Sequence, residues 1–129
     1  MQIHHIGVVI PSEEIAANFI KMFGLQEDYR GYVPEYQSLC IFMKGNGSPP
    51  LEFIIPSGGK LSEYNKGRGG IHHIAYKVED IHKTKTELEK SGAQFLEETP
   101  VKGAGNFIVN FIRPRSTGGI LVELVQSTK

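Results

Sequence analysis

The sequence predicts an α+β fold made of two similar halves, each with the element order βαβββ. The first observation is a repeated tetrapeptide, because Ile-His-His-Ile occurs at 3–6 and again at 71–74. The same shift of 68 residues also aligns Gly24 with Gly92, so one register accounts for both matches, as expected of a structural repeat. The second observation is that apolar segments and turn residues follow one another in the same order in both halves.

In the first half, an apolar strand is expected at 3–10. A helix is expected next, because Ser12 is a suitable N-cap, two glutamates follow it, and apolar residues recur at helical spacing. Gly24 is a suitable C-terminal stop for this helix. Turn residues then separate three more expected strands, at 29–33, 38–43 and 51–55.

The second half repeats this series. A strand is expected at 71–78, and a helix is expected between an N-cap at Asp80 and a stop at Ser91-Gly92. Three further strands are expected at 94–98, 106–113 and 120–125.

The length and composition predict a single domain over 1–129. Its halves cover about 1–57 and 70–129, and the Gly-rich loop between them, at 57–70, is either a linker or a functional lid. Fourteen basic and fourteen acidic residues balance, which excludes long-range attraction to nucleic acid or an anionic membrane. Cys40 is the only cysteine, so no disulfide forms within the chain. The first apolar run is too short for a signal peptide or membrane span, so a cytoplasmic protein is expected.

The histidines of the repeat divide between the two faces of their strands. Neighbouring residues on a strand point to opposite faces, and large apolar residues alternate with the second histidine of each pair, His5 or His73. The apolar set is expected to pack on the helix of its own half. His5 and His73 then lie on the other face, and a small residue, Gly7 or Ala75, follows each of them two positions later.

Each half also carries one glutamate within an apolar last strand, Glu52 or Glu123. An ionised carboxylate that is buried without a partner costs several kcal/mol, so each needs a cation, a strong donor or a wet cavity. The plain alternative is that each histidine pair has one surface and one core member and that each glutamate lies at an exposed edge. Matched positions in both halves favour a metal site, with one divalent ion bound by His5, Glu52, His73 and Glu123. Such mixed ligands accept Co, Ni, Mn, Zn or Fe, so the metal stays open.

Two segments carry a resemblance to a known family, namely GGIHHIAYKVEDI at 69–81 and RPRSTGGILVELVQ at 113–126. With the expected strand order, they make the chain resemble the vicinal oxygen chelate (glyoxalase/bleomycin resistance/dioxygenase) superfamily, and most of all the methylmalonyl-CoA epimerases. The resemblance implies a glyoxalase-like fold, in which paired βαβββ modules form a cupped mixed sheet around a metal. It also implies one ligand from the first strand and one from the last strand of each module, which gives the same four residues.

The resemblance further implies a metal-dependent isomerase that moves the C2 proton of a methylmalonyl-CoA-like 2-acyl thioester via a metal-stabilised enolate. In this interpretation Glu123 and Glu35 are the two proton carriers. Arg113 and Arg115 lie beside a Gly pair and suit the phosphates of the thiol carrier. The expected partner is a small-molecule acyl thioester, with no nucleic acid and no membrane, and the resemblance implies a homodimer.

Three other functions compete with this interpretation. Glyoxalase I, a lactoylglutathione lyase, shares the same set of two histidines and two glutamates. A ring-cleaving dioxygenase needs two histidines and one carboxylate on iron and is usually longer. A metal-free drug-binding resistance protein has the same fold but tends to line its cleft with aromatic residues, and this chain has no Trp. The acyl group and the thiol carrier stay open, as does whether the site lies within one chain or between two.

Overall fold

The computed structural model describes residues 1–129, which form two compact units. One unit consists of His5–His72, and the other consists of Met1–His4 together with His73–Lys129. The boundaries therefore fall inside the two Ile-His-His-Ile segments, between the histidines of each pair. The residues His5 and His73 begin the long continuous segment of their respective units.

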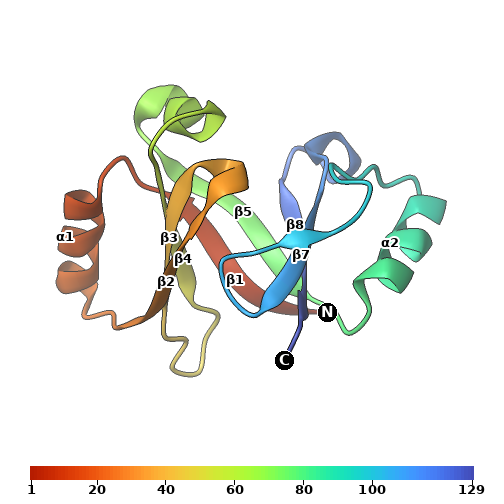
Figure 1. Ribbon diagram of the computed structural model, residues 1–129, viewed down its shortest axis with the longest axis horizontal. Helices are drawn as coiled ribbons and strands as arrows, with labels where there is room; N and C mark the ends of the chain where they lie inside the picture. The colour runs from red at the N-terminus through yellow and green to blue at the C-terminus, as the bar shows by residue number, and fades with distance from the viewer. The chain divides into compact units, whose positions relative to one another are not determined.

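The unit His5–His72 contains four sheet strands that are neighbours in the order β2-β3-β4-β1. Strand β1 runs parallel to β4, whereas β2, β3 and β4 are antiparallel neighbours (Figure 1). The elements of this half are β1 (Gln2–Val9), α1 (Glu13–Phe23), β2 (Glu27–Val33), the 3₁₀ turn η1 (Pro34–Tyr36), β3 (Ser38–Met43), β4 (Leu51–Pro56) and η2 (Lys60–Gly67).

Helix α1 begins and ends where the sequence predicts. The Ser12 hydroxyl accepts a hydrogen bond from the Ile15 N–H at 3.2 Å, and Gly24 adopts a left-handed conformation with φ of 64°. The helix lies along one face of the sheet, where buried Ala16 belongs to an apolar core with Ile41 and Phe53 (Figure 1). Every second side chain of each strand points to this helix, and the side chains between them point to the opposite face of the sheet.

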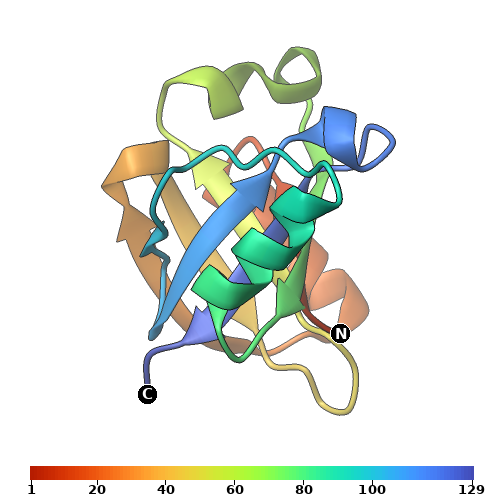
Figure 2. The ribbon, with the colours of Figure 1, turned by 90° about the vertical axis from the view of Figure 1, so that its right-hand side faces the viewer.

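The second unit repeats this plan with the strand order β5-β8-β7-β6, and β5 runs parallel to β8. Asp80 caps helix α2 by accepting a hydrogen bond from the Lys83 N–H at 3.0 Å, as predicted. The helix lies across one face of β7 and β8 and buries Ile81 against Leu124 (Figure 2). The elements are β5 (Gly70–Lys77), α2 (Ile81–Lys90), β6 (Val101–Lys102), β7 (Phe107–Ile112), η3 (Pro114–Ser116) and β8 (Val122–Ser127).

The strand predicted at 94–98 is wrong. Phe95 makes only an isolated bridge with Ile112, and the short strand β6 follows later in the chain. The cause is Asn110, whose buried side chain accepts a hydrogen bond from the Glu97 N–H at 3.1 Å and donates one to the Glu97 carbonyl at 2.9 Å. A side-chain amide thus takes the place of the backbone ladder at this point.

The Gly-rich segment at 57–70 contains η2 and is fastened at its end. The Tyr64 hydroxyl donates a hydrogen bond to the Ile71 carbonyl at 2.6 Å, and the Asn65 side-chain amide donates one to the Gly69 carbonyl at 2.7 Å. Gly69 has φ of 75°, and a Cβ atom there would lie 2.2 Å from the Val9 carbonyl oxygen. Only glycine therefore allows the chain to pass so close to β1 before β5 begins.

The predicted α+β class is confirmed, with the order βαβββ in each half. The other predicted strands are present, and β3 covers the predicted residues 38–43. No helix of the structure is both long and apolar enough to cross a membrane.

Candidate functional site

The first unit places His5 and Glu52 side by side on the face of the sheet that α1 does not cover. Gly7 lies opposite Glu52 in the β1–β4 register, so His5 lies two residues earlier on the same face. The Nε2 atom of His5 is 3.1 Å from Oε1 of Glu52. Both side chains are buried, with no more than 6% of either residue exposed.

The second unit repeats this arrangement with His73 and Glu123. Ala75 lies opposite Glu123 in the β5–β8 register, and the Nε2 atom of His73 is 3.3 Å from Oε1 of Glu123. These two side chains are also buried. The structure therefore brings one histidine and one glutamate together in each half, and their role as metal ligands stays a prediction.

Each His–Glu pair has an aromatic neighbour that the sequence analysis did not find. Phe42 lies opposite Glu52 on β3, and its ring meets the His5 ring edge-on, with centroids 5.1 Å apart and planes at 82°. In the second unit Phe111 lies opposite Glu123 and meets His73 at 5.3 Å and 89°. Such edge-to-face contacts fix the plane of the imidazole. The signal was available, because a shift of 69 residues aligns the two phenylalanines.

The chemistry of the donor set fits a divalent metal. The side chains of His5, His73 and Glu123 each offer one ligand atom that a metal ion could use, and Glu52 has the same chemistry as Glu123. A buried carboxylate is costly without a cation beside it, and imidazole with carboxylate suits transition metals. Both carboxylates are buried with an imidazole nitrogen within 3.3 Å, so the side chains present in each unit are compatible with metal binding.

The other histidine of each pair has a different environment. His4 is half-buried and meets Phe107 of its own unit, with centroids 5.4 Å apart. His72 is half-buried and meets the Tyr64 ring at 5.0 Å and 77°. The duplicated tetrapeptide therefore supplies one buried histidine beside a glutamate and one half-buried histidine against an aromatic ring, in each half.

Tyr29 on β2 extends the first pair and was also missed. Its ring stacks on Phe42 with centroids 4.8 Å apart and planes at 13°. Burial, followed by the negative charge of Glu52, raises the pKa of the Tyr29 hydroxyl to about 12. The hydroxyl therefore keeps its proton at neutral pH. Composition and periodicity did not reveal this residue, because its place depends on an irregularity of β2.

The remaining predicted residues lie in short turns outside the His–Glu pairs. Glu35 is exposed on η1, which follows β2. Arg113 and Arg115 are exposed on either side of Pro114 in the η3 turn, shortly before β8. All three side chains are accessible to a ligand.

Two βαβββ halves, each with one buried His–Glu pair on its strands, define the class of this protein. Residues 4–111 match the Glyoxalase/Bleomycin resistance protein/Dioxygenase superfamily, and the chain belongs to this superfamily.

Three known proteins show the similarity over nearly the whole chain. The human mitochondrial methylmalonyl-CoA epimerase is 31% identical over 98% of this chain and 74% of its own length. An ethylmalonyl-CoA/methylmalonyl-CoA epimerase of Cereibacter sphaeroides is 31% identical over 97% of both chains. The crystal structure of the Mycobacterium tuberculosis methylmalonyl-CoA epimerase superposes with a TM-score of 0.91, at 22% identity, over 98% of this chain and 88% of that one.

These similarities confirm the predicted family resemblance and the glyoxalase-like fold. They also support the predicted enzyme class, an isomerase of the epimerase type.

Proposed function

We propose that the protein is a metal-dependent epimerase that moves the C2 proton of a methylmalonyl-CoA-like 2-acyl thioester. The observation that carries this proposal is the buried His–Glu pair that both units repeat, at 3.1 and 3.3 Å. It occurs in a chain that aligns over nearly its full length with methylmalonyl-CoA epimerases. The small-molecule substrate is therefore an acyl thioester.

In this proposal His5, Glu52, His73 and Glu123 would together hold one divalent ion, with one pair from each unit. The matched burial of the two pairs supports a shared role, since each half supplies the same two ligand types. When bound, the ion would supply positive charge that stabilises the negative charge building on the thioester oxygen as the C2 proton leaves. The edge-on phenylalanines would keep both imidazole planes fixed for this task.

The proton transfers need two groups. Epimerisation removes the proton from one face of the C2 carbon and returns a proton to the opposite face. We assign these steps to Glu123 and Glu35. If Glu35 is one carrier, Glu35→Gln is expected to leave exchange of the C2 proton in one epimer while interconversion of the two epimers falls sharply. Equal loss of exchange from both epimers would contradict this division of roles.

Arg113 and Arg115 are the proposed contacts for the phosphates of the thiol carrier. Both guanidinium groups are exposed on η3, and arginine binds phosphate oxygens in a bidentate manner. Replacing both by methionine is expected to raise KM for the CoA thioester and to leave kcat nearly unchanged. An unchanged KM would remove this assignment. We further propose a homodimer, which light scattering after gel filtration tests directly.

The experiment that tests the function is proton exchange. Metal-loaded protein is incubated with methylmalonyl-CoA in deuterated water, and NMR follows the C2 proton. The expected result is that the C2 proton signal disappears only when metal is present. His72→Ala is expected to exchange this proton like the wild type, whereas His73→Ala is expected to keep the signal. The matched control replaces the neighbouring histidine, which contacts Tyr64 instead of a glutamate. Absence of exchange in wild-type protein that binds metal would refute the proposed function.

A second candidate function is a glyoxalase I-type lyase, and Glu52 is the observation that favours it. With Glu52 and Glu123, each unit supplies a carboxylate as well as an imidazole, which is the ligand set that the glyoxalase I resemblance implies. The same protein incubated with methylglyoxal and glutathione tests this candidate. Formation of the lactoyl thioester, without C2 exchange in methylmalonyl-CoA, would favour the lyase.

A further inference from the structure

Strand β2 contains an irregularity that decides which side chain faces the His5–Glu52 pair. Glu27 lies opposite Met43 of β3, yet Tyr29 lies opposite Phe42, so one extra residue, Asp28, is inserted between them. Such a β-bulge changes the direction of the following side chains. Without it Asp28 would lie opposite Phe42, and a second carboxylate beside Glu52 would replace the phenol on this face.

The bulge completes a row of side chains across the sheet of the first unit. The register places Tyr29 beside Phe42, Phe42 beside Glu52, and Glu52 beside Gly7, on four neighbouring strands. The Tyr29 ring stacks on Phe42, and the edge of Phe42 meets His5. Tyr29 is thus held on the same face as the His–Glu pair through one intervening ring.

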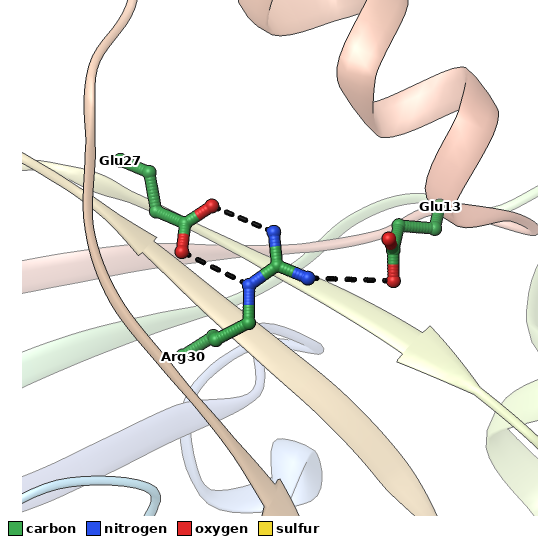
Figure 3. Close-up of polar contacts among 3 residues, drawn as sticks. All are labelled: Glu13, Glu27 and Arg30. Carbon is green, nitrogen blue, oxygen red and sulfur yellow. Dashed lines mark hydrogen bonds and ion pairs between the residues drawn. The ribbon is translucent and has the colours of Figure 1, made fainter.

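The opposite face of β2 holds the bulge in place. The Arg30 guanidinium donates hydrogen bonds to both carboxylate oxygens of Glu27, at 2.9 and 2.7 Å, and lies 3.4 Å from Glu13 of α1 (Figure 3). Residues three apart on a regular strand point to opposite faces. The inserted residue brings Glu27 and Arg30 to the same face. The ion pairs of Arg30 with Glu27 and Glu13, here called the clamp, therefore form only in the bulged register.

The hydroxyl of Tyr29 differs from those of two other tyrosines in the same unit. Tyr32 shares a hydrogen bond with Ser57 at 3.1 Å, and Tyr64 donates one to the Ile71 carbonyl. The half-buried Tyr29 hydroxyl makes no hydrogen bond within the protein. A phenol in this state is a neutral donor, ready for an oxygen of a ligand.

The second unit has no counterpart of this tyrosine. Its row contains Phe111, Glu123 and Ala75, and the backbone N–H of Leu96 binds the Phe111 carbonyl where the next strand would lie. Leu96 is an exposed aliphatic residue. The repeated fold therefore forms without a tyrosine at this point, which argues for a function of Tyr29 outside folding.

We propose that Tyr29 is a substrate-binding residue, whose hydroxyl donates a hydrogen bond to an oxygen of the acyl group bound beside His5 and Glu52. This inference rests on the proposed function, because it takes the ligand to be an acyl thioester. The bulge and its clamp set the position of the donor, and the Phe42 ring supports it. The thiol carrier, which is common to every acyl thioester of its kind, makes no contact with this hydroxyl.

The test compares Tyr29→Phe with the matched control Tyr32→Phe, each of which removes one hydroxyl from the same strand. Isothermal titration of the metal-loaded proteins measures affinity for methylmalonyl-CoA and, separately, for CoA without an acyl group. Tyr29→Phe is expected to bind methylmalonyl-CoA about 3- to 10-fold more weakly, the effect of one lost hydrogen bond, with its affinity for CoA unchanged. Tyr32→Phe is expected to bind both like the wild type.

Equal affinities of Tyr29→Phe and wild type for methylmalonyl-CoA would overturn the proposal, as would an equal loss of affinity for CoA. Thermal unfolding shows whether the variant is folded, and the ring that stacks on Phe42 is retained. Proton exchange is measured in parallel. Binding without exchange in the wild type would refute the epimerase function and leave the role of Tyr29 supported, whereas no binding of either thioester or CoA would overturn both.

Discussion

Binding of a divalent ion is expected to raise the midpoint of thermal unfolding, and His73→Ala is expected to remove most of that rise. An ion at 100 times its dissociation constant stabilises the folded state by about 2.7 kcal/mol. Unfolding of 129 residues has an entropy of about 270 cal/mol/K, so the midpoint should rise by about 10 °C.

The substitution removes one ligand and leaves Glu123 without the imidazole that lies 3.3 Å from its carboxylate. Loss of a residue that only supports a metal ligand lowers metal affinity by up to about 100-fold, so loss of a ligand should lower it at least as much. A 100-fold loss of affinity for the ion would reduce the rise to about 1.5 °C at the same ion concentration.

Differential scanning calorimetry measures both effects on protein freed of metal with a chelator and without a histidine tag. Cobalt, nickel, manganese, zinc and iron are added singly, and a second addition of chelator must reverse the shift. His72→Ala is the control, because it removes the adjacent histidine, which contacts Tyr64. A midpoint of His73→Ala that rises by nearly as much as that of the wild type, to within about 2 °C, would refute the ligand assignment. Loss of the rise in His72→Ala would do the same.

Four further substitutions test the scaffold. Ser12→Ala removes the cap of α1, which should cost about 1 kcal/mol and lower the thermal midpoint by about 4 °C in calorimetry. Asn110→Leu removes two hydrogen bonds and strands two backbone groups, so urea denaturation should give a stability lower by about 2–4 kcal/mol. Gly92→Ala should lower the free energy of unfolding by about 1–2 kcal/mol, because φ is 98° there. No atom lies close enough for the added Cβ to clash, so backbone strain is the whole cost. Gly69→Ala should cost more than Gly92→Ala in the same urea titration, because its Cβ would also meet a backbone oxygen 2.2 Å away.

Much of the fold was predictable because its signals are local and occur twice. The cap at Ser12 and the stop at Gly24 are short-range signals that the structure bears out. The alternation of apolar residues with His5 and His73 separated the two faces of each first strand, although the face that carries the histidine is the more deeply buried one. Strand alternation is a reliable guide where one face packs on a helix, since a one-residue slip would expose every apolar side chain.

The features that were missed depend on pairing between strands, which a single strand does not encode. Phe42 and Phe111 reach the histidines because each lies opposite a glutamate on the neighbouring strand. The predicted strand at 94–98 failed because Asn110, distant in sequence, binds the backbone N–H and carbonyl of Glu97 and so interrupts the ladder. Tyr29 needed the bulge at Asp28, which becomes visible only when the register with β3 is known.

The two proposed ligands of the site, a metal ion and an acyl thioester, make different demands on the repeated halves. In the proposed function one metal ion is bound by two equivalent His–Glu pairs, which requires the two halves to be alike at these residues. An acyl thioester has no such symmetry, because its acyl group and its thiol carrier differ in size, charge and hydrogen bonding. A site that serves both needs is expected to be alike close to the ligands and different farther from them.

The two units follow this expectation. They share a histidine, a glutamate and an edge-on phenylalanine, with nearly equal distances. They differ in the next position of the row, where only the first unit has an aromatic donor, Tyr29, held by a bulge and a charged clamp. They differ again before the last strand, where only the second unit has the arginine-bearing turn η3. Binding of the acyl group is therefore expected to depend on the first unit and binding of the thiol carrier on the second. Substitutions in the first unit should lower affinity for the acyl group, and substitutions in the second should lower affinity for CoA.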